Sequence, residues 1–213
     1  MSLFCVFLIG CGGGSGKSDD ITTPTPVVVT PTLTPVTNYQ LEDTETLITQ
    51  VTNELQGLSI EEFFEQAFQI TQARNSENAF SDGNFDQFMA ESANLFNISD
   101  DFAKQTADIE AHLLTLLLAY DREVLSTQNQ LSYDVYQAHL ENQIKWFENK
   151  DYSYPATYGF FGWPGGTESF FTQVFTITDK NQADIYLSLL NQVGRRFEQI
   201  EVLLDARKDS GII

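Results

Sequence analysis

Side chains that suit a buried face recur at alternating intervals of four and three residues in the segment 99–123, and this spacing constrains the fold most strongly. The positions are Phe102, Thr106, Ile109, Leu113, Leu116 and Tyr120. An α-helix turns once in 3.6 residues, so these positions share one of its faces, whereas a half-buried strand would alternate every second residue. Ser99 stands where an N-cap belongs. The segment therefore predicts an amphipathic helix with one buried face.

Further segments of the chain repeat this helical pattern. Helices are expected over residues 41–56, over 59–74 behind the capping box of Ser59 and Glu62, from Ser126 to about residue 147, and over about 178–208. A short helix is also expected over 85–96. The stripe of the last helix is Ala183, Tyr186, Leu190, Val193, Phe197, Ile200 and Leu204. Strand patterns are scarce, so we expect an all-α helical bundle that begins near residue 40.

One segment, residues 152–171, combines many aromatic rings with glycine and proline. Glycine and proline interrupt helices, so we expect a long loop here. Its rings have two interpretations: they pack back over the bundle, or they bind a peptide or a glycan. The candidate residues for binding, or for lining a cleft, are Tyr158, Phe160, Phe161 and Trp163.

The N-terminus resembles the lipobox of bacterial lipoproteins. Residues 3–9 are apolar, too few to cross a bilayer, and Gly10 and Cys11 follow. We expect residues 1–10 to be a signal peptide, Cys11 to carry lipid, and residues 11–39 to be a flexible Thr/Pro tether. A buried N-terminal strand is the alternative. A phosphate-binding loop at Gly16-Lys17-Ser18 is excluded, because the motif needs glycine at position 11 and a helix behind the serine.

Charge and residue types exclude several function classes. A net charge of −19 excludes a nucleic-acid partner. The only histidines, His112 and His139, lack the spacing of paired metal ligands, so we expect no metal, no cofactor and no catalytic residue in this chain. We expect Arg195 and Arg196 to pair with nearby acids such as Glu198 or Glu201.

Three stretches, at 58–79, 125–144 and 176–213, resemble the N-terminal region of the bacterial family catalogued as domain of unknown function 885. The most specific piece is the last helix with its ending "GII". The resemblance implies a mostly helical, exported lipoprotein similar to zinc metallopeptidases. The His-Glu motif and the Pro-Gly-His tail that imply a zinc site in that family have no counterpart here, so no ligand is carried over.

Two functions are therefore expected in outline. In the first, residues 40–213 are the helical N-terminal part of a larger lipid-anchored, peptidase-like protein, truncated at Ile213 and not catalytic alone. Its partners would be the membrane, through Cys11, and the missing C-terminal part or a peptide substrate. In the alternative, the chain is a stand-alone helical lipoprotein that binds a peptide, glycan or protein through residues 152–171. Both functions place the chain in the bacterial cell envelope, at the outer membrane or the periplasmic side.

Gly211 is expected to cap the last helix.

Overall fold

The computed structural model describes residues 43–75, 77, 94–156 and 162–212, and these residues form an all-α fold as predicted. They all belong to one compact unit. The predicted signal peptide, Cys11 and the Thr/Pro tether lie outside the described residues.

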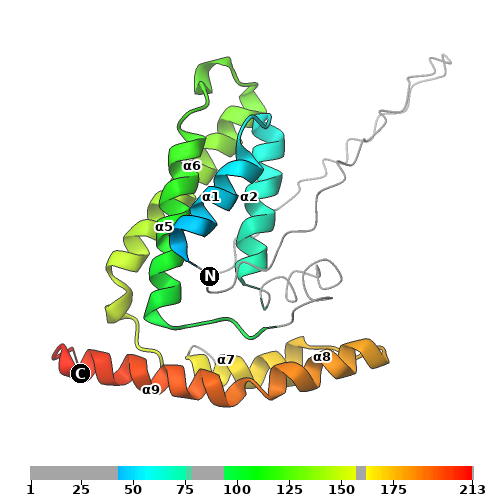
Figure 1. Ribbon diagram of the computed structural model, residues 1–213, viewed down its shortest axis with the longest axis vertical. Coiled ribbons are helices and arrows are strands. Elements are labelled where there is room, and N and C mark those ends of the chain that lie inside the picture. The colour runs from blue at the N-terminus through cyan, green and yellow to red at the C-terminus, as the bar shows by residue number, and fades with distance from the viewer. Residues whose placement is uncertain (1–42, 76, 78–93, 157–161, 213) are drawn as a thin grey trace, which may run out of the picture. The chain divides into compact units, whose positions relative to one another are not determined.

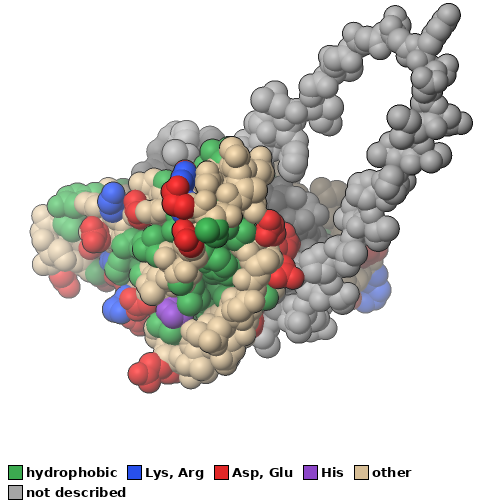
Figure 2. Space-filling view, turned by 90° about the horizontal axis from the view of Figure 1, so that it is seen from above, with side chains coloured by type: hydrophobic (Ala, Val, Ile, Leu, Met, Phe, Trp, Pro, Cys, Tyr) green, Lys and Arg blue, Asp and Glu red, His purple; other side chains and the backbone are tan. Residues whose placement is uncertain are grey.

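The first four described α-helices form a bundle (Figure 1). They are α1 (Thr44–Leu55), α2 (Ile60–Arg74), α5 (Asp100–Leu117) and α6 (Thr127–Glu148). Helix α5 packs against α6 and α1, and α1 packs against α2. Their shared core consists of Leu47, Val51, Leu55, Ile60, Phe63, Ala67, Ile70, Ile109, Leu113, Leu117, Tyr133 and Leu140. The short 3-10 helix η1 (Arg122–Val124) connects α5 to α6, and at this end of the bundle apolar side chains gather between acidic ones (Figure 2).

Side-chain caps begin these helices at the positions that the sequence predicts. The Ser59 hydroxyl accepts a hydrogen bond from the Glu62 amide, and the Glu62 carboxylate accepts one from the Ser59 amide, so the capping box is complete. The Ser99 and Ser126 hydroxyls accept hydrogen bonds from the Phe102 and Asn129 amides and so cap α5 and α6. These local signals fix where each helix starts, because they satisfy amide groups that have no partner inside the helix.

The aromatic segment departs from the prediction. After the 3-10 helix η2 (Lys150–Tyr152), the chain forms α7 (Trp163–Ser169) and continues into the π-helix η4 (Phe170–Val174). The expectation that glycine and proline stop any helix in this segment is wrong for residues 163–171. Pro164 lies in the first turn of α7, where an amide hydrogen has no partner within the helix to lose.

The last predicted helix is two helices, α8 (Lys180–Leu190) and α9 (Val193–Asp209). Asp179 caps α8. The buried face of this pair also differs from the predicted stripe, since Leu190 and Phe197 are 45% and 48% exposed. The buried positions are Leu189, Arg196, Ile200, Leu203 and Arg207. Two arginines therefore occupy the buried face, which is turned by roughly 60° around α9 from the predicted apolar stripe and shares Ile200 with it.

The C-terminal cap of α9 is as predicted. Gly211 has a φ of 72°, its amide donates to the Lys208 carbonyl, and the Ile212 amide donates to the Arg207 carbonyl. This pair of bonds is the Schellman motif, which favours glycine because other residues rarely adopt positive φ. The short helix expected over 85–96 does not include its last three residues, since residues 94–96 are not helical, and positions 85–93 lie outside the described residues.

Candidate functional site

A non-helical segment, residues 95–98, lies along α9 and enters α5 through the Ser99 cap (Figure 1). The amide of Leu95 bonds to Gln192, and the amide of Ile98 bonds to Gln199. From Gln192 to Gln199, seven residue steps along a helix advance about 10 Å. The three steps from Leu95 to Ile98 cover that length only when their backbone is extended. The 95–98 segment is therefore an extended peptide that runs parallel to α9.

Four polar side chains bind this peptide, at or next to the start of α9. The Gln192 side chain accepts from the Leu95 amide at 3.1 Å, and Arg195 donates to the Leu95 carbonyl at 3.0 Å. Arg196 donates to the Phe96 carbonyl at 2.8 Å. Gln199 accepts from the Ile98 amide at 3.3 Å and donates to the Asn97 side chain at 2.7 Å. Positions 192, 195, 196 and 199 share one face of a helix, so one face of α9 contacts the whole segment.

The side chains of the segment fill apolar sites. Leu95 is 1% exposed and packs among aromatic residues of η4 and the following turn, together with Leu189. Ile98 packs against Ile200 and Leu203 of α9. The Phe96 ring stacks on Trp163, with centroids 5.8 Å apart. Two aliphatic sites and one aromatic platform thus add side-chain recognition to the main-chain hydrogen bonds.

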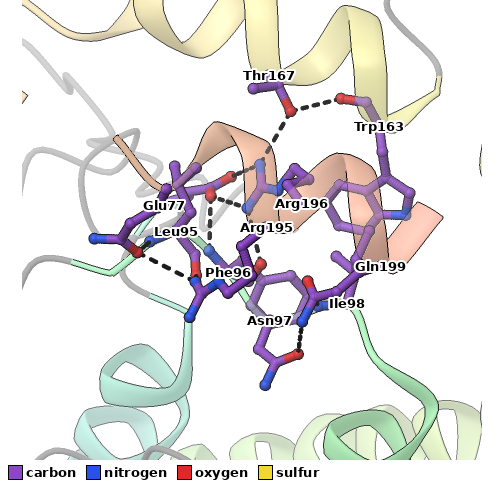
Figure 3. Close-up of polar contacts among 11 residues, drawn as sticks. Glu77, Leu95, Phe96, Asn97, Ile98, Trp163, Thr167, Arg195, Arg196 and Gln199 are labelled. Atoms are coloured by element: carbon purple, nitrogen blue, oxygen red, sulfur yellow. Dashed lines mark hydrogen bonds and ion pairs between the residues drawn. The ribbon is translucent and has the colours of Figure 1, made fainter. Parts of the chain in front are cut away.

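A buried ion pair lies at the centre of this site (Figure 3). Arg196, which is 1% exposed, pairs with the carboxylate of Glu77, and the same carboxylate accepts a hydrogen bond from the Phe96 amide at 2.7 Å. Arg196 also donates to the Thr167 hydroxyl at 3.2 Å and lies over the Trp163 ring, 5.4 Å from its centroid. Glu77 and Arg196 therefore hold Phe96 by both its amide and its carbonyl.

Of the four predicted binding residues, Trp163 is the one that the structure describes; Tyr158, Phe160 and Phe161 lie outside the described residues. Trp163 belongs to the peptide site, because its ring contacts Phe96 and Arg196. Elsewhere in the aromatic segment, Tyr152 and Tyr154 are 82% and 45% exposed. A shallow hollow of about 430 Å³ is lined by Tyr154, Leu204, Asp205 and Lys208. A binding role for the four residues stays a prediction.

The expected partners of the two arginines are wrong. Arg196 pairs with Glu77, more than one hundred residues earlier, and Arg195 donates to the Leu95 carbonyl and to Gln192. The sequence did hold a signal for this site: Gln192, Arg195, Arg196 and Gln199 follow the spacing i, i+3, i+4, i+7 on one face. A search for apolar periodicity misses this face, because the residues on it that contact the 95–98 segment are polar.

A second polar cluster lies between α2, α5 and α6. Arg74 is buried, donates to Gln105 and Thr106, and lies 4.1 Å above the centre of the Phe102 ring. Burial raises the pKa of Glu110 to about 7, although Gln143 and Arg74 oppose this. Burial likewise raises the pKa of the Tyr136 hydroxyl. A buried carboxyl group whose pKa lies near neutrality can change its charge in the ordinary pH range.

The two histidines occupy structural positions in the bundle. His112 of α5 lies 2.8 Å from the Thr52 hydroxyl of α1, and His139 stacks on Tyr136 within α6. Burial lowers the pKa of both imidazoles. Among the described residues, no group of three or more His, Cys, Asp or Glu side chains is arranged to hold a metal ion.

No family model matches the chain, and no curated protein and no solved structure is significantly similar to it. In the part of the chain that the structure describes, no helix has the length and apolar character needed to span a bilayer.

Proposed function

We propose that this chain is the helical N-terminal part of an exported protein that is anchored by lipid on Cys11 and that resembles zinc metallopeptidases. The anchor is supported by the apolar run 3–9 followed by Gly10 and Cys11. The larger protein is supported by the resemblance of residues 58–213 to the family catalogued as domain of unknown function 885. In this proposal the chain positions and supports a further domain and does not itself carry out catalysis.

The observation that carries the proposal is the exposed apolar face of α8 and α9. Leu190 and Phe197, which belong to the stripe that the sequence predicts to be buried, are 45% and 48% exposed, and Leu187 outside that stripe is 57% exposed. Large apolar side chains that a helix leaves exposed are typical of a surface that packs against another domain. The His-Glu motif and the Pro-Gly-His tail of that family do not occur in this sequence, so in this proposal any zinc ligands come from the further domain.

Lipid attachment is tested by expressing the full chain in a Gram-negative host that is fed radiolabelled palmitate. We expect label in the membrane fraction for the natural chain and for Cys5→Ala, because Cys5 leaves with the signal peptide. Cys11→Ala is expected to lose the label. Label that persists in Cys11→Ala, or a natural chain without label, contradicts the proposal.

The larger protein is tested with the coding region that follows position 213. We expect amide hydrogen exchange of α8 and α9 to slow when this region is expressed in the same polypeptide, because it covers Leu190 and Phe197. Unchanged exchange in α8 and α9 contradicts a packing role for this face.

A second candidate, a stand-alone lipoprotein that binds through the aromatic segment, is favoured by the exposure of Tyr154 beside Lys208. An aromatic ring next to a charged side chain suits a glycan or a peptide. Tyr154→Ala and the matched variant Tyr152→Ala separate the two residues in a glycan- and peptide-array binding assay. The second candidate requires that Tyr154→Ala reduces binding at least tenfold, while Tyr152→Ala, which lies outside the hollow, changes it less.

A further inference from the structure

We propose that the face of α9 that holds the 95–98 segment, together with α7 and η4, is a binding groove for an extended peptide from another chain. In this interpretation the 95–98 segment is a resident occupant that competes with peptides from other chains. The partner is an extended peptide with leucine, an aromatic residue, a polar residue and isoleucine in succession. This inference is independent of the proposed lipid anchor and of any further domain.

The first argument is the kind of atoms that the groove contacts. Gln192, Arg195, Arg196 and Gln199 form hydrogen bonds with amides and carbonyls of the peptide, and Gln199 adds one to the Asn97 side chain. Main-chain groups are the same in every peptide, so such bonds give affinity for any extended chain in the right register. Ordinary packing between helices does not require this arrangement.

The second argument is the set of apolar sites at fixed intervals. Leu95, with 1% exposure, and Ile98, with 7%, fill separate clusters three residues apart. Phe96 lies between them on the Trp163 ring. Apolar sites that accept particular side chains of a main-chain-bound peptide supply the sequence preference of a recognition groove.

The third argument is that the central arginine of the groove is held in place by partners outside the 95–98 segment. Arg196 is held by Glu77 and Thr167 as well as by the Phe96 carbonyl. Its guanidinium also lies over Trp163. A donor that is fixed in place by other partners costs little conformational entropy when a peptide binds, so the groove is preorganised.

The test uses the full chain carrying Cys5→Ser and Cys11→Ser, which removes thiols and lipid attachment, and a fluorescent peptide that copies residues 94–99, Asn-Leu-Phe-Asn-Ile-Ser. In a Leu95→Ala background the resident segment loses its main apolar anchor, while the free peptide retains it. A weakened competitor leaves more of the groove open, which raises the apparent affinity for the free peptide in proportion. We expect at least tenfold tighter binding by fluorescence anisotropy in Leu95→Ala than in the otherwise unchanged chain.

Matched controls identify the groove. A peptide with alanine in place of the leucine is expected to bind the Leu95→Ala chain at least tenfold more weakly. The same loss is expected for a peptide whose leucine amide nitrogen is methylated, since the Gln192 oxygen then has no amide hydrogen to accept. Adding Gln199→Ala to the Leu95→Ala chain is expected to reduce peptide affinity at least tenfold. Equal binding of the leucine and alanine peptides overturns the proposal, as does no binding by a Leu95→Ala chain that keeps its helical circular dichroism.

Phe96→Ala provides a second route if Leu95→Ala does not fold. Phe96 is only partly buried, so its removal is milder than loss of the buried leucine. Tighter binding of the fluorescent peptide to Phe96→Ala than to the unchanged chain supports the groove, and equal or weaker binding overturns it.

Discussion

The partly buried carboxyl group of Glu110 makes the stability of the bundle depend on pH in a defined direction. Burial raises its pKa from the ordinary value of 4.5 to about 7. The folded state therefore binds the proton more tightly than the unfolded state, so the free energy of unfolding falls as the pH rises from 4.5 to 7. Below pH 4.5 the group is protonated in both states and has no effect of this kind.

The size of the effect follows from linkage. Each pH unit between the two pKa values costs about 1.4 kcal/mol, which gives on the order of 3 kcal/mol in total. The pKa of about 7 already includes the attraction of Arg74, which lowers the pKa of Glu110, so no further correction is needed. Glu110→Gln removes the ionisation and keeps a side chain of similar shape. We expect the free energy of unfolding of the variant, relative to the natural chain, to rise by about 2 to 3 kcal/mol between pH 5 and pH 8.

Urea denaturation followed by circular dichroism at pH 5, 6, 7 and 8, at constant ionic strength, measures this difference. The histidines oppose the effect, since their lowered pKa values make the natural chain more stable as the pH rises through their range. They do so in both proteins and cancel in the comparison. Glu201→Gln, at an exposed site on α9, is the matched control for the loss of one carboxylate. A difference for Glu110→Gln that does not change with pH would refute the reasoning.

Three further predictions concern single contacts. Arg196→Met should lower the free energy of unfolding by about 3 to 5 kcal/mol, because the Glu77 carboxylate loses its buried partner, whereas Arg195→Met should cost about 1 kcal/mol in the same urea titration. Comparable losses in the two variants would show that burial of the ion pair is not the cause. Ser59→Ala should cost about 1 kcal/mol through loss of the capping box, against less than about 0.5 kcal/mol for the exposed Ser188→Ala. Gly211→Ala should speed amide hydrogen exchange in the last turn of α9 at Ile212, since alanine is strained at a φ of 72° and the turn frays, and unchanged exchange there would contradict the role given to Gly211.

The helices could be predicted from sequence because their signals are local. Ser59, Ser99, Ser126 and Asp179 each cap a helix within three residues of themselves, and the apolar spacing of α5 lies within a single segment. Such signals depend on neighbours in sequence, so no knowledge of the rest of the fold is needed.

The candidate site could not be predicted in the same way, because its partners are distant in sequence. Leu95 meets Gln192, and Glu77 meets Arg196, across roughly half of the chain. The face of α9 was also misplaced, since arginine counts as polar in a periodicity argument although Arg196 and Arg207 are almost fully buried. A long side chain buries its stem and satisfies its charge on carbonyl and carboxylate oxygens, which periodicity does not record.

The C-terminal end of α9 is fastened by a different chemistry from its beginning. Arg207 donates to the main-chain carbonyls of Asp151, Lys150 and Leu203, and its distance to the Asp151 carboxylate is 3.8 Å. A main-chain carbonyl is present whatever side chain its residue carries, so substitutions at Lys150, Asp151 or Leu203 leave the acceptors of Arg207 in place. The ion pair of Glu77 and Arg196 depends on one carboxylate side chain, which a single substitution removes. The end of α9 should therefore tolerate sequence changes among its partners better than the beginning does.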